Sequence, residues 1–349
     1  MSYKDKFRQV EPYVAGEQPK IVNMIKLNTN ENPYGPSLRI QEALKDADIN
    51  KLRLYPSSNA DDLQLALSEY YHLDKDQVFL GNGSDEVLAL SFLTFFNGKE
   101  PILFPNISYS FYPVYCDLYQ MAFKELPLTK DLKIVKEDYY QPNSGIIFPN
   151  PNAPTGLLVD LDFIEDILKH NQDSIVIIDE AYIDFGGTSA LPLLDKYENL
   201  VIIQTFSKSR SLAGSRIGIA LGSKEVIAHL YDVKNSFNSY PIDYLTQLVG
   251  VASVKDSNDM KEKCQKVINT RERVKKELKE LGFIVPDSYA NFVFVSHPTI
   301  DIPKLFKDLR KEGIIVRHWD KPLIKDYLRI SIGTDEQMNA LINFLNNYK

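Results

Sequence analysis

The feature that most constrains the fold is a run of four β-branched residues, Ile-Val-Ile-Ile at 175–178, which Asp179 ends. β-branched residues favour extended backbone, and an unbroken apolar run of this length is typical of a parallel strand that is buried on both faces. A carboxylate directly after such a strand lies at the carboxyl edge of the sheet, where open α/β folds bind their ligands. The run therefore predicts an α/β fold with a mostly parallel sheet, and it makes Asp179 a candidate for a binding site.

The rest of the chain shows further strand-like and helix-like segments. Strands are expected at residues 77–80, 101–104, 122–125, 145–149, 200–205 and 217–221, and again at 291–295, 313–317 and 327–333. Helices are expected at residues 37–47, 61–72, 87–96, 161–170, 257–281 and 304–312. A chain of 349 residues exceeds what one core usually serves. We expect an arm at 1–30, a large α/β domain at 31–235 and a small α+β domain at 236–349, with residues 31–50 left open between the two domains.

Composition limits the classes of function. The net charge of −7 argues against nucleic-acid binding as the main task. No apolar run reaches the roughly 18 residues of a membrane span, and the charged N-terminal segment lacks the apolar core of a signal peptide. Cys116 and Cys264 lie far apart, and the five histidines show no metal-ligand spacing. We therefore expect no disulfide framework, no metal and a cytoplasmic location.

A single lysine, Lys208, stands in the serine-rich turn between the strands expected at 200–205 and 217–221. Burial at a strand end favours the neutral amine, which can add to an aldehyde and form a Schiff base. Hydroxyls of Thr205 and Ser207 and the guanidinium of Arg216 suit a phosphate dianion. A lysine beside a phosphate site suggests pyridoxal 5'-phosphate, although a solvated turn has the same composition.

The run Gly-Asn-Gly-Ser-Asp-Glu at 81–86 lies between an expected strand and an expected helix. Free N–H groups and the helix dipole make such a turn an anion site, and here the donors would be the backbone amides of Ser84 and Asp85. A dinucleotide fingerprint would need a third glycine where Glu86 stands, which disfavours a nicotinamide enzyme. The turn is expected to form the second wall of the phosphate site.

The segment Ser-Lys-Ser-Arg-Ser-Leu-Ala-Gly-Ser-Arg-Ile-Gly at 207–218 resembles the lysine motif of the class I/II aminotransferases of fold type I. From Tyr13 to Gly333, the chain resembles the histidinol-phosphate aminotransferase family within that class. The resemblance implies a large domain with a mostly parallel, seven-stranded-type sheet and a small domain built from both chain ends. It also implies a homodimer with a shared active site.

The resemblance assigns cofactor roles to residues spread along the chain. Lys208 would hold the aldehyde and move the proton, Asp179 would pair with the ring nitrogen, and Tyr182 would bind the phenolic oxygen. Tyr109 would stack on the ring, whereas Tyr112 and Tyr115 read as core packing. The family's asparagine before the proline is replaced by Ala153, so Asn152 is the nearest amide to take its place. The phosphate would be bound by Ser84, Asp85, Thr205, Ser207 and Arg216, and by Tyr55 from the partner subunit.

The resemblance also assigns substrate contacts. Arg329, in the run Leu-Arg-Ile-Ser-Ile-Gly, would hold the amino-acid carboxylate, while Arg317 and Tyr13 would bind the substrate phosphate and Asn30 would lie at the site entrance. The implied reaction is transamination of L-histidinol phosphate with 2-oxoglutarate in histidine biosynthesis. An aromatic amino-acid aminotransferase or a threonine-phosphate decarboxylase shares much of this motif set and stays open. A regulator with an aminotransferase-like domain would need a DNA-binding module, for which the arm is too short.

Overall fold

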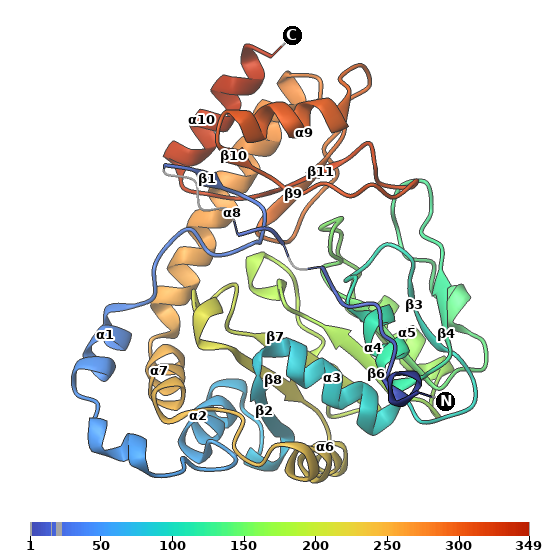
Figure 1. The fold of residues 1–349 in the computed structure, drawn as a ribbon, viewed down its shortest axis with the longest axis vertical. Helices are drawn as coiled ribbons and strands as arrows, with labels where there is room; N and C mark the ends of the chain where they lie inside the picture. Colours follow the sequence, from blue (N-terminus) through green and yellow to red (C-terminus); the bar gives the residue numbers. More distant parts are fainter. Residues whose placement is uncertain (1, 15, 19–22, 349) are drawn as a thin grey trace.

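The computed structural model describes residues 2–14, 16–18 and 23–348. A seven-stranded sheet forms its centre, in the order β2-β8-β7-β6-β5-β3-β4 (Figure 1). All neighbouring strands are parallel except that β8 is antiparallel to both β2 and β7. The strands are β2 (Val78–Asn82), β3 (Ile102–Pro105), β4 (Phe123–Leu126), β5 (Gly145–Pro149), β6 (Val176–Asp179), β7 (Leu200–Thr205) and β8 (Ile217–Leu221). The predicted α/β class and the mostly parallel sheet are confirmed.

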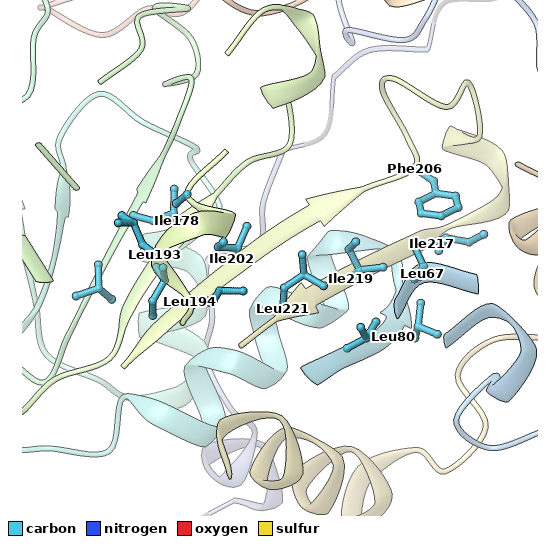
Figure 2. Packing of buried hydrophobic residues seen from close by; sticks show 14 of the residues in the cluster. Leu67, Leu80, Ile178, Leu193, Leu194, Ile202, Phe206, Ile217, Ile219 and Leu221 are labelled. Atoms are coloured by element: carbon cyan, nitrogen blue, oxygen red, sulfur yellow. The ribbon is translucent and has the colours of Figure 1, made fainter. Parts of the chain in front are cut away.

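Apolar side chains cover the large sheet on both faces. Ile178 and Ile202 belong to one buried cluster, whereas Ile177 and Ile203 belong to another, because successive residues of a strand point to opposite faces. Figure 2 shows the first cluster, in which Ile202 and Leu221 lie among side chains from several elements. The helices of this part are α1 (Leu38–Lys45), α2 (Asp61–Tyr71), α3 (Gly83–Phe95), α4 (Tyr112–Tyr119), α5 (Leu161–His170), α6 (Lys224–Phe237) and α7 (Tyr244–Lys255).

Strand β1 and the C-terminal third of the chain form a smaller unit at the top of Figure 1. Its strands form two short pairs, one parallel between β1 and β10 and one antiparallel between β9 and β11. One apolar cluster joins Leu27, next to β1, to residues of the C-terminal third such as Leu328. The elements are β1 (Ile25–Lys26), β9 (Phe292–Val295), β10 (Ile314–Ile315), β11 (Leu328–Ser331), α8 (Ser257–Glu280), α9 (Ile302–Lys311) and α10 (Asp335–Asn346).

Several boundaries differ from those expected from the sequence. Helix α3 begins at Gly83, four residues before the expected start, because the glycine turn itself forms the first helical turn. Helix α6 continues to Phe237, inside the segment that we expected to start the second domain. Helix α7 contributes Val249 and Ala252 to the cluster under the large sheet, so the packing there does not follow the expected division at residue 236. The domain limits stay a prediction.

Candidate active site

The carboxyl ends of β6 and β7 place the two central residues beside one another. Asp179 pairs with Ile203 across the two strands, and β7 ends at Thr205, three residues before Lys208. Two cavities meet at this edge, and Lys208 and Tyr182 line both of them. The first cavity, of about 180 Å³, is lined among others by Asp179, Ser84, Ser207 and Arg216. The second, of about 140 Å³, is lined among others by the residues Tyr13, Asn30, Arg317, Trp319 and Arg329.

An N-terminal segment holds Lys208 in place. The Nζ atom of Lys208 donates to the carbonyl oxygen of Thr29 at 3.1 Å, and it lies 5.8 Å from the centre of the Tyr182 ring. The side-chain amide of Asn32 donates to the carbonyl oxygen of Lys208 at 3.2 Å. Lys208 lines both cavities, and its role there stays a prediction.

Asp179 is a buried carboxylate, only 4% exposed. Its Oδ2 atom accepts a hydrogen bond from the Tyr112 hydroxyl at 2.9 Å, and its Oδ1 atom accepts one from the Ala181 N–H at 3.2 Å. Burial raises the pKa of Asp179 to about 6, and these two hydrogen bonds act against the rise. An ionised group in this place would be stabilised by a cationic ring nitrogen in the cavity that it faces.

Tyr182 and Asn30 form a pair at the junction of the cavities. The Asn30 side-chain amide donates to the Tyr182 hydroxyl at 2.9 Å, and Asn30 is itself held by the hydroxyl of Ser331, which donates to its Oδ1 at 2.8 Å. The Tyr182 ring packs edge-on against Phe292 of β9. Among the described residues, the Tyr182 hydroxyl thus has one donor and no acceptor, so its own hydrogen can go to an acceptor in the cavity.

The first cavity has the groups that a phosphate requires. Helix α3 begins there with Ser84 in its first turn, and the hydroxyls of Thr205 and Ser207 lie 2.9 Å apart on the facing side. Arg216 Nη2 is 2.9 Å from Asp85 Oδ2, so the Asp85 side chain, and not only its backbone, belongs to the site. Tyr109 donates to the other Asp85 oxygen at 2.9 Å. Free N–H groups, hydroxyls and a guanidinium at a helix N-terminus fit a phosphate dianion.

The second cavity has two arginines side by side. Arg317 and Arg329 face each other in an antiparallel bridge, with N–H···O=C distances of 3.0 and 2.9 Å, and residues paired in this way point to the same face. Arg329 is half-buried, and desolvation of its guanidinium lowers its pKa; its Nη2 donates to the carbonyl oxygen of Asn28 at 2.8 Å. Its Nε is buried without a partner among the described residues. A carboxylate in the cavity would satisfy that donor.

Two predicted cofactor residues are not brought to these cavities. Both amide hydrogens of Asn152 are used, by the carbonyl of Ile107 at 3.0 Å and the hydroxyl of Thr155 at 3.1 Å, and it is Ala153 that lines both cavities. The amide thus turns away from the site, against the expectation that it replaces the family's asparagine. Tyr55 lies on the surface, 84% exposed and stacked on Tyr240, so its role through a partner subunit stays a prediction.

Several residues of the site were not predicted from the sequence. Trp319 packs against both arginines: its ring centre is 5.3 Å from the Arg317 guanidinium and 5.2 Å from that of Arg329. Glu31 lines the first cavity and is hydrogen-bonded to Thr29, but its position in an irregular Asn- and Pro-rich run offered no periodic signal. Tyr112 was expected to be packing only, yet it donates to Asp179. The contact between Tyr112 and Asp179 joins residues 67 positions apart, whereas Trp319 and Glu31 contact residues that are close to them in the sequence.

Comparisons with known proteins show the family to which the chain belongs. Residues 22–345 match the family model described as aminotransferase class I and II. The chain is 60% identical over 348 residues to the histidinol-phosphate aminotransferase of Lactococcus lactis subsp. cremoris (strain SK11), covering 100% of this chain and 98% of that relative. The crystal structure of the histidinol-phosphate aminotransferase from Clostridium acetobutylicum has a TM-score of 0.84 at 27% identity, over 92% of this chain and 99% of that one. The enzyme of Sinorhizobium meliloti in complex with pyridoxal-5'-phosphate shares the fold, with a TM-score of 0.82 at 21% identity over 91% of this chain and 89% of that one.

The seven-stranded sheet, the lysine after β7 and the buried carboxylate after β6 together define a fold-type I aminotransferase, a class whose cofactor is pyridoxal 5'-phosphate. The match to the family model and the 60% identity then identify the family within this class. The chain belongs to the histidinol-phosphate aminotransferase family of the class I and II aminotransferases. The predictions of family, fold class, enzyme class and cofactor are confirmed. Within the described residues, no helix has the length and apolar character to cross a membrane.

Proposed function

We propose that this chain transfers the amino group of L-histidinol phosphate to 2-oxoglutarate, giving imidazole acetol phosphate and L-glutamate, as a cytoplasmic step of histidine biosynthesis. The names of the relatives supply the substrate, since the chain is 60% identical to one of them over its whole length. The cytoplasmic location is supported by two free, buried cysteines, Cys116 and Cys264, which suit a reducing compartment.

One observation carries the proposal: Lys208 lies where a cavity suited to a phosphate-bearing cofactor meets a cavity with two arginines. When bound, pyridoxal phosphate supplies an aldehyde that captures amines and a ring that accepts electrons from the substrate Cα. Ser84, Thr205, Ser207 and Arg216 would hold its phosphate. Asp179 would hold a proton on its ring nitrogen.

The chain's own residues provide the proton transfers and the orientation. The amine of Lys208 lies between the cavities and would carry the proton that leaves the substrate Cα, as a general base and then as a general acid. Tyr182, fixed by Asn30, would donate its hydroxyl hydrogen to an oxyanion in the first cavity. Arg329 would bind a substrate carboxylate, and Arg317 beside it would bind the phosphate of histidinol phosphate or the second carboxylate of 2-oxoglutarate. Two adjacent cations in one pocket suit both substrates because each carries a strongly anionic end.

The substrate assignment is tested by initial rates. The holoenzyme would be assayed with L-histidinol phosphate, phenylalanine and threonine phosphate at equal concentrations, with 2-oxoglutarate as acceptor where an acceptor is needed. We expect the highest kcat/KM for histidinol phosphate. A higher value for phenylalanine, or carbon dioxide release from threonine phosphate, would replace this proposal with one of the two alternatives.

The homodimer belongs to the same proposal. Large apolar side chains are exposed in two stretches of the chain, residues 38–55 and 237–240, which touch where Tyr55 stacks on Tyr240. They are Leu38, Ile49, Leu52, Leu54, Tyr55, Phe237 and Tyr240. Exposed apolar groups of this number favour an interaction surface. The family resemblance assigns Tyr55 to the partner's phosphate site, and its 84% exposed side chain is available to a second chain.

A mixing experiment tests both dimerisation and sharing of the site. Chains with Lys208→Ala and chains with Tyr55→Ala would be unfolded together and refolded, because a mixed dimer with a shared site contains one intact site. We expect a species of twice the chain mass by light scattering, and activity above that of either variant alone. A mass of one chain by light scattering would contradict the dimer. No gain of activity in a dimer shown to contain one chain of each variant would contradict the shared active site.

A further inference from the structure

Asp179 depends on a residue that no role above explains. Tyr112, the first residue of α4, is fully buried, and its hydroxyl donates to Asp179 Oδ2 at 2.9 Å. Among the described residues, the other carboxylate oxygen accepts a single hydrogen bond, from the Ala181 N–H at 3.2 Å. Within residues 2–14, 16–18 and 23–348, Asp179 forms no ion pair. Tyr112 therefore supplies one of two hydrogen bonds that hold this carboxylate before a cofactor arrives.

Neighbouring rings fix the position of the Tyr112 hydroxyl. The ring of Phe104 crosses that of Tyr112 at 67° with centres 5.8 Å apart, and the ring of Tyr109 meets it edge-on at 5.7 Å and 84°. Phe92 closes a third side at 6.2 Å. A ring held on three sides cannot swing away from Asp179 without disturbing the wall of the first cavity, to which Tyr109 belongs.

We propose that Tyr112 is a positioning residue for the transamination: its hydroxyl holds the Asp179 carboxylate in orientation and keeps it ionised, so that Asp179 can keep a proton on the cofactor's ring nitrogen. This inference rests on the proposed function. Tyr112 itself does not touch the reacting atoms, and it acts only through Asp179.

The chemistry of the buried pair supports this role over simple packing. A phenylalanine would fill the same space, and a buried hydroxyl is costly unless it finds an acceptor. Burial and the adjacent Asp179 raise the pKa of Tyr112 well above its ordinary value, so the hydroxyl keeps its hydrogen and remains a donor. The other titratable groups that act on this pair are Asp85, Tyr109, Tyr115 and Lys208. Without the Tyr112 hydroxyl, this buried carboxylate would lose one of its two donors, and its neutral form would be favoured.

The test compares Tyr112→Phe with Tyr139→Phe as a matched control. Tyr139 is also buried, but its hydroxyl has no partner among the described residues, so its loss removes a buried hydroxyl and no hydrogen bond. Both variants and the unchanged chain would be loaded with pyridoxal phosphate that carries ¹⁵N in its ring. The ¹⁵N chemical shift then reports directly whether the ring nitrogen is protonated.

We expect the unchanged chain and Tyr139→Phe to keep a protonated ring nitrogen. In Tyr112→Phe the shift should move toward that of the neutral ring. The rate of the half-reaction with glutamate should fall roughly 10- to 100-fold with little change in KM, the loss expected for one hydrogen bond to a charged group. In an Asp179→Asn background, Tyr112→Phe should have little further effect, because residues that act through one another are not additive.

Each contrary result has a definite meaning. An unchanged ¹⁵N shift and rate in Tyr112→Phe would overturn the inference, and so would an equal loss in the Asp179→Asn background. If Tyr112→Phe unfolds below the assay temperature while Tyr139→Phe does not, the hydroxyl is structural and the inference is wrong. If instead the unchanged chain neither binds pyridoxal phosphate nor transaminates, the proposed function fails before Tyr112 is at issue.

Discussion

Lys208 takes its position from segments that are far from it in the sequence. Its strand, β7, brings it to the edge of the sheet, but its amine is held by the carbonyl of Thr29 and its backbone by the amide of Asn32. A lysine held by a neutral carbonyl can give up that contact when a better partner enters the cavity. This makes Lys208 the residue on which turnover depends most.

Lys208→Ala should abolish turnover. Loss of the amine removes both the covalent anchor and the general base, and general acid–base groups alone contribute about 10²- to 10⁴-fold. We expect the half-reaction with glutamate to slow by at least that factor, and the absorbance near 420 nm that borohydride removes from the unchanged chain to be lost. Lys276→Ala, at an exposed position of α8, serves as the control and should keep full activity. Full turnover in Lys208→Ala would contradict the assignment.

Arg329→Lys should weaken substrate binding and leave cofactor binding unchanged. The variant keeps a positive charge but loses the planar fork, including the buried Nε that has no partner among the described residues. We expect KM for glutamate to rise about 10- to 100-fold, as for the loss of a charged hydrogen bond. Fluorescence of Trp319, the single tryptophan of the chain and 5.2 Å from the Arg329 guanidinium, would report substrate binding in both proteins. The prediction is wrong if the KM values agree within twofold.

At the scale of elements, β8 and α3 meet so closely that only glycine fits between them. A Cβ on Gly218 would lie 2.3 Å from the carbonyl carbon of Gly83 and 2.4 Å from the nitrogen of Ser84. Since Ser84 is in the first turn of α3, this contact sets the position of the phosphate-binding wall. The close approach of a strand to a helix start explains why a glycine follows Arg216 so closely.

Gly218→Ala should therefore shift the start of α3, lower affinity for pyridoxal phosphate at least about tenfold and destabilise the chain by about 1–3 kcal/mol. Gly214→Ala, in the short turn just before β8, is the control, because a Cβ there meets nothing within 4 Å. Cofactor titration and thermal unfolding of both variants check the prediction. Equal cofactor affinity and equal thermal stability of the two variants would show that the close contact between β8 and α3 is not needed for either.

What the sequence could predict differs between elements and contacts. Strand β6 was predictable because four β-branched residues form a local pattern, and α8 because its apolar residues follow a helical period. The direction of the Asn152 side chain could not be predicted from a local pattern, because Ile107, whose carbonyl accepts from its amide, lies 45 residues away. Tyr112 was likewise expected to be packing, because nothing near it in the sequence indicates that its hydroxyl reaches Asp179. Local patterns fix elements, whereas site contacts depend on how distant elements pack.

At the scale of the whole molecule, two adjacent carboxyls couple stability to pH. Asp179 and Glu180 follow one another at the end of β6, and both are buried. Glu180 accepts hydrogen bonds from Ser189, the Ala190 N–H and Gln204, at 2.7, 2.7 and 2.8 Å. Burial nevertheless raises the pKa of Glu180 from 4.5 to about 7 and that of Asp179 from 3.8 to about 6. The folded chain thus binds protons at these sites more tightly than the unfolded chain.

The sign of the effect follows from that difference. Between about pH 4 and pH 7 the folded state holds more protons than the unfolded state, so the free energy of unfolding of the cofactor-free chain should fall as pH rises. The shift of Glu180 alone corresponds to about 3 kcal/mol, all of it present below the unfolded pKa and lost once pH has risen through the folded one. Glu180→Gln has no carboxyl to titrate. The difference between its free energies of unfolding at pH 5 and pH 8, measured in urea, should therefore be smaller by most of that amount, about 2.5 kcal/mol. Glu312→Gln, at an exposed carboxylate, should keep the original pH dependence. A Glu180→Gln chain with that same dependence would show that the carboxyl is ionised throughout, and that its three donors, rather than burial, set its charge.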